Sequence, residues 1–402
     1  MPHPRLAIIG AGPIGLDLAL AAAERQLPYT LYEAADEVAG HVSDWAHVRT
    51  FTPWSMNLSE RMRQALERAG RPAPDGEDRP LGRELIDRLY QPLADLPQIA
   101  PHLALGRRVV AIGRSGLLKH EEIATATRGA RPFRLLIEEG AGEESVAEAD
   151  LVVDTSGQAI PNALGDAGVP APGERANDAR IHRQIPDVAA EPNAWAGRTT
   201  LLVGAGHSAQ TALRNLLSLA ESRPGTRVIW AMRGRGPEPI ADDPLPDRQA
   251  LTTAAADAAR TPEASRGALQ VHRRVVVDAL AAAGGDRLAV DLRPVDGSLA
   301  ATRVEVDRVL ALTGRVGDAA PYRQLQVHEC YATSGPMKLA AALLASSGAG
   351  GDCLDQVSAG ADALRSPEPG FFLLGSKSYG RRNDFLMRTG FQQVDDLMSL
   401  ID

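Results

Sequence analysis

A glycine-rich turn near the start of the chain places the strongest constraint on how it can fold. The short apolar run Arg5–Ile9 ends at Gly10-Ala11-Gly12-Pro13-Ile14-Gly15, and an Ala-rich, helix-like stretch, Leu16–Arg25, follows. This order predicts a strand, a turn and a helix. In such a turn Gly10 permits the sharp bend, Gly12 lets the backbone approach a pyrophosphate, and Gly15 lets the helix pack closely on the strand. The free N–H groups at the helix N-terminus would then attract phosphate charge.

An acidic residue after the next strand favours a dinucleotide site. Tyr29–Tyr32 is predicted to be the second strand, and Glu33 ends it. A carboxylate at this strand end suits the pair of hydroxyl groups on a ribose. The alternative is that the glycines close an ordinary βαβ unit. The agreement of strand, glycines, helix and acid favours the dinucleotide site.

The pattern occurs a second time in the middle of the chain. Arg198–Val203 is predicted to be a strand that runs into Gly204-Ala205-Gly206-His207-Ser208-Ala209, where alanine takes the third glycine position. The following strand, Thr226–Trp230, leads to Arg233 and Arg235 rather than to an acid. Arginines at this place favour NADPH, because a guanidinium group can hold a 2′-phosphate with two hydrogen bonds. The alternative is that both arginines are simply solvated.

Ser208 also fits a different motif, the G-x-S-x-G turn that carries the nucleophile of a hydrolase. Gln210 stands where that motif has its last glycine, and a hydrolase needs neither Gly204 nor the N-terminal turn. We therefore expect Ser208 at the start of the helix, where its hydroxyl group can cap free N–H groups.

Length and charge indicate a two-domain protein that binds small molecules. The chain has 402 residues, 44% of them hydrophobic, and one core rarely extends beyond roughly 250 to 300 residues. A formal net charge of -8 argues against general binding to nucleic acid or to anionic membranes. We see no signal-type segment and no apolar stretch of membrane length, so we expect a cytoplasmic location. The sequence does not determine the oligomeric state and is compatible with a homo-oligomer.

The side chains offer little redox or metal chemistry of their own. Cys330 and Cys353 are too far apart for a C-x-x-C dithiol, and the nine histidines form no known metal-binding spacing. We expect both thiols to be buried, and we expect no metal site. Redox chemistry would therefore depend on an organic cofactor.

The rest of the chain predicts an α/β protein with two Rossmann-like dinucleotide-binding domains, the second inserted into the first. Two similar strand ends, Ala149–Gly157 and Val306–Gly314, flank the second glycine-rich unit and indicate crossings between the domains. We expect residues 1–165 and 315–402 to form the first domain and residues 166–314 to form the second. Two further strands, around Arg108–Ile112 and Phe133–Ile137, predict a small antiparallel layer.

The order of these elements resembles the two-dinucleotide-domain flavoproteins, and within them the flavin-containing monooxygenase-like group more than the disulfide reductases. Both glycine-rich turns, Glu33, the two strand ends and a closing segment, Gly370–Gly375 with the helix Phe391–Ile401, carry the resemblance over most of the chain. It implies that the first domain binds FAD and the second NADPH. The residues implied for FAD are Gly10, Gly12, Pro13, Gly15, Glu33, Gly375 and Gln392, and those for NADPH are Gly204, Gly206, Ser208 and Arg233.

The activity that the resemblance implies is monooxygenation. NADPH would reduce FAD, and one oxygen atom of O2 would pass through a flavin C4a-peroxide to a small organic substrate. The group's F-x-G-x-x-x-H signature before the second turn has only a remnant here, Gly173–His182. The alternatives are a flavin reductase or dehydrogenase with another electron acceptor, and a non-enzymatic flavoprotein that senses NADPH.

The resemblance also implies candidate site residues. Asn57 and His182 are predicted to hydrogen-bond near the flavin or the nicotinamide. The segment His41–Asn57 is rich in aromatic residues in a chain that is only 4% aromatic, and we expect Arg49 and Trp54 to contact the substrate. The alternative is that this segment packs its aromatic rings over the flavin.

Overall fold

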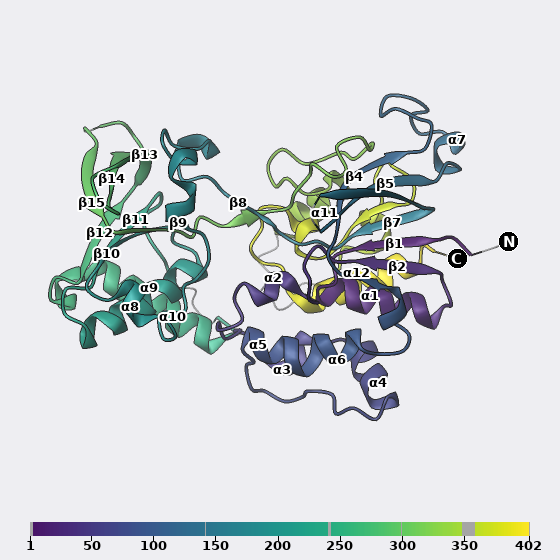
Figure 1. Cartoon of the computed structure of the whole chain (residues 1–402), viewed down its shortest axis with the longest axis horizontal. Helices are drawn as coiled ribbons and strands as arrows, with labels where there is room; N and C mark the ends of the chain where they lie inside the picture. The colour runs from purple at the N-terminus through teal and green to yellow at the C-terminus, as the bar shows by residue number, and fades with distance from the viewer. Residues whose placement is uncertain (1–2, 141, 240–242, 299, 348–357, 402) are drawn as a thin grey trace. The chain divides into compact units, whose positions relative to one another are not determined.

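The chain forms two compact units, as a computed structural model that describes residues 3–140, 142–239, 243–298, 300–347 and 358–401 shows. One unit comprises residues 1–160 and 316–402, and the other comprises residues 161–315. The second unit is therefore inserted into the first, and the chain crosses between them in β8 (Ile160–Pro161) and β17 (Arg315–Val316). In Figure 1 the purple, blue and yellow parts of the chain build the first unit, and the teal and green parts build most of the second.

The first unit is built on a parallel sheet with the order β18-β7-β1-β2-β3. Its strands are β1 (Leu6–Ile9), β2 (Tyr29–Tyr32), β3 (Leu103–Ala104), β7 (Leu151–Asp154) and β18 (Phe371–Leu373). Alternate residues of β1 face opposite sides of the sheet, so Leu6 and Ile8 enter one apolar core and Ala7 and Ile9 enter another. Because β18 comes from the C-terminal part of the chain, both parts of the unit are needed to complete the sheet.

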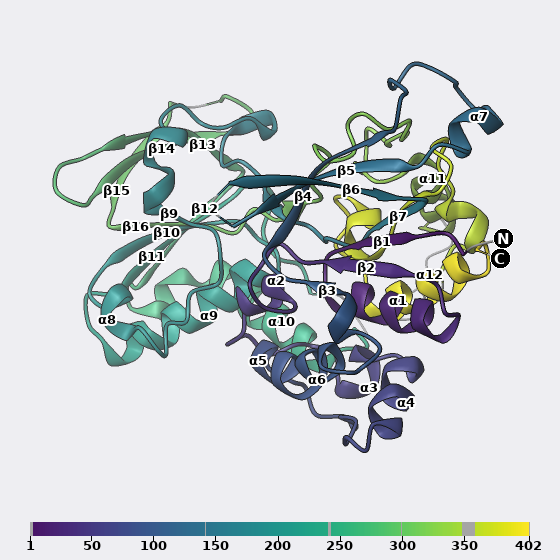
Figure 2. The same ribbon diagram turned by 45° about the vertical axis from the view of Figure 1, so that its right-hand side comes forward.

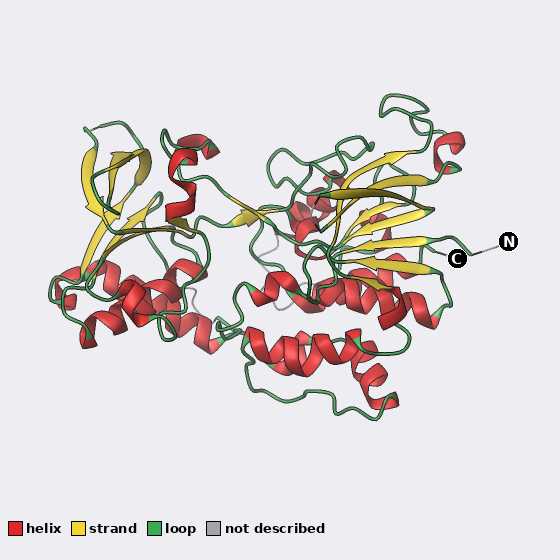
Figure 3. Cartoon of the chain, viewed as in Figure 1, coloured by secondary structure: helices red, strands yellow, loops and turns green. Residues whose placement is uncertain are grey.

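The two faces of this sheet are covered by different layers, which Figures 2 and 3 show. An antiparallel sheet covers one face and consists of β4 (Arg107–Arg114), β5 (Phe133–Glu139) and β6 (Glu143–Ala149). Two helices, α1 (Pro13–Glu24) and α12 (Met387–Met398), cover the other. The antiparallel layer agrees with the prediction, except that β6 was not expected.

The chain between β2 and β3 is mainly helical, and its apolar side chains share the core beneath α1. It contains α2 (Gly40–Ser43), α3 (Trp54–Asn57), α4 (Glu60–Arg68), α5 (Gly82–Leu85) and α6 (Gln91–Ala94), and a π-helical turn, Ile86–Tyr90, joins the last two. Elsewhere in the unit, α7 (Ala126–Gly129) lies between β4 and β5, and α11 (Met337–Ser347) precedes the closing strand β18.

A buried charge cluster joins the antiparallel layer to the C-terminal part of the first unit. Glu368, which precedes β18, pairs with Arg114 at 2.7 Å and with Arg128 at 2.8 Å, and all three side chains are fully buried. Each charge has a partner, which a buried ion needs in order not to destabilise the fold.

The second unit repeats the plan of the first. Its parallel sheet has the order β12-β11-β10-β16-β9. The strands are β9 (Ile181–His182), β10 (Thr199–Val203), β11 (Arg227–Met232), β12 (Leu269–Arg273) and β16 (Arg308–Ala311). One face is covered by α8 (Pro192–Trp195), α9 (His207–Ser222) and α10 (Pro246–Arg260), and the other by β13 (Val275–Ala282), β14 (Leu288–Pro294) and β15 (Thr302–Val306). In both units the glycine-rich turn joins the central strand to a helix.

These arrangements confirm the predicted α/β fold with two Rossmann-like domains, the second inserted into the first. The predicted repeat was limited to the glycine-rich turns, whereas the observed one extends over the whole layered architecture. Among the described residues, no helix combines the length and the apolar character needed to cross a membrane.

Candidate cofactor site

A cavity of about 490 Å³ lies in the first unit, at the carboxyl ends of its parallel strands. This edge of an open parallel sheet is where ligands bind in proteins of this architecture. Five residues predicted to bind a cofactor line the cavity: Gly10, Gly12, Pro13, Glu33 and Gly375. Several residues that the sequence did not indicate line it as well, among them Asp154, Ser156, Gln158, Lys377 and Phe385.

The first glycine-rich turn has the backbone geometry that its sequence predicts. Gly10 has a φ of 99°, and a Cβ atom on Gly15 would collide with the carbonyl oxygen of Gly10. At Gly12, by contrast, a Cβ atom would meet no other atom within 4 Å. Gly12 is also the N-cap of α1, and no side chain caps the helix. The turn therefore presents open backbone and uncapped N–H groups, which suit an anionic ligand.

Glu33 stands at the end of β2, and two backbone amides fix its carboxylate. The N–H of Ala11 donates to Oε2 at 2.8 Å, and the N–H of Ala35 donates to Oε1 at 3.0 Å. The bond from Ala11 ties the strand end to the glycine-rich turn. Each oxygen keeps a lone pair, so the carboxylate could still accept hydrogen bonds from ribose hydroxyl groups.

A buried ion pair forms a part of the cavity wall that the sequence did not reveal. Nζ of Lys377 lies 2.5 Å from Oδ2 of Asp154 and 3.0 Å from Oγ of Ser156. The Lys377 and Asp154 side chains are only 2% and 1% exposed. Lys377 follows β18 and Asp154 ends β7, so the pair joins the two chain segments of the unit at the cavity.

The closing helix holds the Gly375 turn through Gln393 and not through the predicted Gln392. Gly375 has a φ of 70°, and its N–H donates to Oε1 of Gln393 at 2.8 Å. Oε1 of Gln392 instead accepts a hydrogen bond from the N–H of Ser358 at 2.9 Å, and Gln392 does not line the cavity. Both residues lie within α12, where neighbouring side chains point in directions about 100° apart, so Gln393 faces the Gly375 turn and Gln392, contrary to the expectation, lies away from the cavity wall.

The second glycine-rich turn, in the other unit, is supported by a buried tryptophan. Gly204 has a φ of 130°, and a Cβ atom there would collide with the carbonyl oxygen of Leu312. The indole N–H of Trp230 donates to the carbonyl oxygen of Gly204 at 2.7 Å. Gly206 is the N-cap of α9, and a Cβ atom on it would meet nothing within 4 Å. This turn offers the same open, uncapped helix start as the first.

Ser208 does not cap that helix, contrary to the prediction, because it is the second residue of α9 and its hydroxyl group is not in the capping position. It is exposed. Gln210, which departs from the hydrolase motif, is buried and stabilises the turn. Its Nε2 donates to the carbonyl oxygen of Ala205 at 2.9 Å, and its Oε1 accepts a hydrogen bond from Thr252 of α10 at 3.0 Å.

Comparison with solved structures shows where this arrangement occurs. The chain is similar to bacillithiol disulfide reductase from Bacillus cereus, with a TM-score of 0.68 and 17% identity over 99% of this chain and 98% of that one. It is also similar to ornithine hydroxylase from Pseudomonas aeruginosa, with a TM-score of 0.64 and 14% identity over 99% of both chains. A third similar structure is the FAD-bound cadaverine monooxygenase of desferrioxamine biosynthesis from Erwinia amylovora, with a TM-score of 0.60 and 11% identity over 84% of this chain and 85% of that one.

The chain has the two-dinucleotide-domain flavoprotein fold. The resemblance deduced from the two glycine-rich turns is thus confirmed at the level of the fold. No protein-family model and no curated protein sequence matches the chain. The similar structures include a disulfide reductase as well as a hydroxylase and a monooxygenase, so the similarity does not select one reaction.

Within this flavoprotein fold, the two predicted catalytic residues belong to different units. Asn57 ends α3 and is fully buried. Its Nδ2 donates to the carbonyl oxygen of Thr52 at 2.9 Å, and its Oδ1 accepts a hydrogen bond from the Thr52 hydroxyl group at 2.7 Å. Asn57 therefore stabilises its own loop and does not line the cavity. His182 is exposed at the end of β9, where its ring packs on Trp195 with the centroids 5.1 Å apart.

The two predicted substrate residues also lie away from the cavity wall. Trp54 is 2% exposed and belongs to the apolar core, and the guanidinium group of Arg88 lies 5.0 Å from its ring centre. A side chain so enclosed cannot contact a substrate, which corrects the prediction for Trp54. Arg49 is exposed and donates to the carbonyl oxygen of Arg79. From the same segment, His41 and Trp45 do line the cavity.

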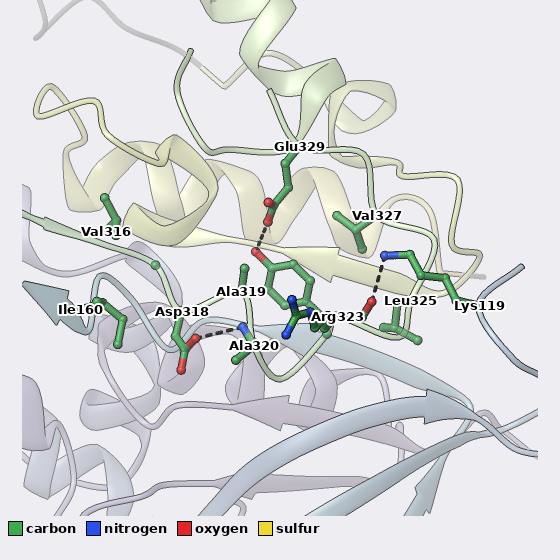
Figure 4. A pocket seen from close by; sticks show the side chains of 12 residues that line it. Lys119, Ile160, Val316, Asp318, Ala319, Ala320, Arg323, Leu325, Val327 and Glu329 are labelled. Atoms are coloured by element: carbon green, nitrogen blue, oxygen red, sulfur yellow. Dashed lines mark hydrogen bonds between the residues drawn. The ribbon is translucent and has the colours of Figure 1, made fainter. Parts of the chain in front are cut away.

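A second cavity of about 490 Å³ adjoins the first, because Asp318 and Ala320 line both. Figure 4 shows its mainly apolar wall, with Ile160 and Val316 at one side and Leu325 and Val327 at the other.

Polar contacts at this second cavity centre on the buried Tyr322. Its hydroxyl group donates to Oε1 of Glu329 at 2.7 Å, and Nζ of Lys377 lies 5.2 Å from its ring centre. Burial and the bond to Glu329 raise the pKa of Tyr322, so the phenol stays protonated. Lys377 lines the cofactor cavity and Tyr322 lines the second cavity, so their contact connects the walls of the two cavities.

One of the two cysteines can be placed. Cys330 is a buried free thiol, and Cys353 lies outside the described residues.

Proposed function

We propose that this chain is an FAD-dependent oxidoreductase that is reduced by NADPH and acts as a monooxygenase on a small organic substrate. The observation that carries the cofactor proposal is the cavity at the strand ends of the first unit, with its open glycine-rich turn, uncapped helix start and fixed carboxylate. The chain also shares its fold with an FAD-bound monooxygenase, which supports the assignment of this cavity to FAD.

The residues present fit a bound FAD. The carboxylate of Glu33 would accept the ribose hydroxyl groups, and the backbone around Gly12 with the N-terminus of α1 would hold the diphosphate. The neutral pair of Lys377 and Asp154 would supply polar groups in the wall of the same cavity. The flavin, when bound, supplies the electron transfer that the side chains of this chain cannot.

For the second unit, the proposal assigns NADPH to the turn at Gly204 and Gly206. The open backbone at Gly206 and the uncapped start of α9 suit a diphosphate, as in the first unit. Arg233, which directly follows β11 and is exposed, would hold the 2′-phosphate. In the overall reaction NADPH, a proton, O2 and substrate would give NADP+, water and the oxygenated substrate, so the electrons balance.

Two features favour oxygen transfer over disulfide reduction. The chain has only two cysteines, and they are far from the C-x-x-C spacing of a redox dithiol. The second cavity offers a largely apolar space beside the cofactor cavity, large enough for a small organic molecule. We therefore place the substrate there rather than at Arg49 and Trp54.

Stopped-flow absorbance of the purified, FAD-loaded protein tests the proposal. Reduction by NADPH should bleach the flavin, and mixing with O2 should then produce a transient band at about 370 to 390 nm before oxidised flavin returns. Direct return of oxidised flavin without that band would overturn the monooxygenase and favour a reductase with another electron acceptor. Failure of the protein to bind FAD at all would overturn the cofactor assignment. NADPH oxidation that no candidate substrate stimulates would favour the non-enzymatic alternative.

A further inference from the structure

Two neighbouring strand ends of the second unit carry arginines side by side. β11 and β12 are parallel, and Met232, the last residue of β11, pairs with Arg273, the last residue of β12. The residues that follow, Arg233 and Arg274, therefore leave the sheet next to each other. A hydrogen bond from the N–H of Arg274 to the carbonyl oxygen of Gly234, at 3.1 Å, holds the two segments together.

The guanidinium groups at this place form no direct ion pair with a described acid, although Arg233 and Arg274 each interact electrostatically with one nearby carboxylate. Arg233, Arg235 and Arg274 are all exposed, and none forms an ion pair with another residue that the structure describes. Other arginines of this unit do form ion pairs, for example Arg303 with Asp291 at 2.9 Å. Like charges gathered without direct ion-pair partners repel one another, and an anionic ligand would relieve that repulsion.

The charges of Arg233 and Arg274 help to lower the pKa of Asp166 and Asp296, respectively, but both carboxylates accept their hydrogen bonds from other groups. Asp166 accepts a hydrogen bond from Arg293 at 3.0 Å, and Asp296 accepts one from the N–H of Ser298 at 3.0 Å. Neither acid comes within ion-pair distance of Arg233 or Arg274. In the described part of the chain, the guanidinium N–H groups of Arg233 and Arg274 thus remain available to a ligand.

The first unit has the same layered plan as the second but carries no arginine at the matching strand ends. In the first unit, Tyr32 of β2 pairs with Ala104 of β3, so the positions that match Arg233 and Arg274 are Glu33 and Leu105. There the first strand end carries an acid and the second carries no charge. In the second unit both positions are arginine, so the charge at this edge of the sheet is reversed.

The backbone of Arg274 adopts a conformation that is most common for glycine. Its φ is 56°, in the left-handed region that glycine adopts most readily, and the N–H of Val295 donates to its carbonyl oxygen at 2.8 Å. Glycine would fit this conformation with less strain, so a change of Arg274 to glycine would remove the guanidinium group without straining the backbone.

We propose that Arg274 on β12, together with Arg233 on β11, forms a two-strand clamp for a phosphate monoester, the 2′-phosphate of NADPH. This inference rests on the proposed function, because it assumes that the second unit binds a dinucleotide. It adds a specificity-determining residue on the neighbouring strand, about forty positions further along the chain in sequence. Two guanidinium groups approaching from different strands would distinguish a dianionic phosphate from the hydroxyl group of NADH.

Calorimetric titration with adenosine 2′,5′-bisphosphate and with adenosine 5′-monophosphate tests the clamp without any flavin reaction. The variant is Arg274→Gly, which removes the guanidinium group and suits the backbone. Its matched control is Arg266→Gly, since Arg266 is also exposed and also has a positive φ, of 53°, but lies before the start of β12 at the opposite edge of the sheet. We expect Arg274→Gly to weaken binding of the bisphosphate about tenfold or more while binding of the monophosphate stays unchanged. Arg266→Gly should change neither.

The outcomes separate the clamp from the function on which it rests. If wild-type protein binds both nucleotides equally, the NADPH assignment fails and the clamp fails with it. If Arg233→Ala abolishes the preference for the bisphosphate but Arg274→Gly leaves it intact, the NADPH assignment survives and the role of Arg274 is refuted. Equal losses for both nucleotides in Arg274→Gly would also refute the clamp, because they would indicate a structural role.

Discussion

Replacing Lys377 with methionine should destabilise the first unit by about 3 kcal/mol. Methionine keeps most of the unbranched stem but removes the ammonium group that lies 2.5 Å from Oδ2 of Asp154. Oδ1 of Asp154 would still accept hydrogen bonds from the N–H and the hydroxyl group of Ser156, at 3.0 and 2.7 Å, whereas Oδ2 would lose its donor. Breaking a buried ion pair by removing one partner costs about 3 to 5 kcal/mol, and the bonds that remain place this case near the lower end.

The free energy of unfolding in urea, followed by circular dichroism at a fixed flavin content, measures this effect. Lys338→Met is the matched control, because Nζ of Lys338 also lies 2.5 Å from a carboxylate, that of Asp362, but the two side chains are 50% and 77% exposed. The control should lose less than about 1 kcal/mol, as exposed pairs do. Adding Asp154→Asn to Lys377→Met should restore part of the loss, since no unpaired charge would then remain buried. Equal losses in the two single variants would refute the argument from burial.

Two further changes test the turn and a buried carboxyl group. A Cβ atom at Gly12 meets no protein atom but points into the space proposed for the diphosphate, so Gly12→Ala should lower the FAD content and leave the melting temperature nearly unchanged. Gly15→Ala should instead lower the melting temperature, because its Cβ atom would collide with the carbonyl oxygen of Gly10. Thermal melts with flavin quantification decide this, and equal behaviour of the two variants would contradict it. Burial raises the pKa of Asp17 to about 6 despite the Arg61 guanidinium at 2.8 Å, so the folded chain binds this proton more tightly than the unfolded chain does. The free energy of unfolding should therefore decline as the pH rises from about 4 through 6, and Asp17→Asn should remove that slope in urea titrations across this range. An unchanged slope in the variant would show that another group titrates.

The sequence predicted those parts of the molecule whose signal is local. Strand, glycine-rich turn and helix follow one another within about twenty residues, and the backbone at Gly10 and Gly204 needs a positive φ that few other residues adopt. Glu33 could be placed because it directly follows its strand. These features gave the fold class and most of the residues around the first turn.

The parts that were missed depend on contacts between distant segments. Lys377 and Asp154 are 223 positions apart, so no spacing rule connects them. Choosing between Gln392 and Gln393 required knowing which face of α12 packs against the Gly375 turn, because each step along a helix turns the side chain by about 100°. Trp54 looked like a pocket residue since aromatic rings serve both in cores and in binding sites, and only the burial of the ring distinguished the two roles.

The insertion of one unit into the other has a consequence for folding during synthesis. Residues 161–315 form a continuous unit that can fold as soon as it leaves the ribosome, whereas the first unit has to wait for its C-terminal segment. Until that segment emerges, Arg114 and Arg128 lack Glu368, and Asp154 lacks Lys377. The nascent first half would thus carry uncompensated charges at positions that are later buried. The wall of the cofactor cavity includes Gly375, Lys377 and Phe385, so we expect FAD to bind only after this segment has joined the sheet.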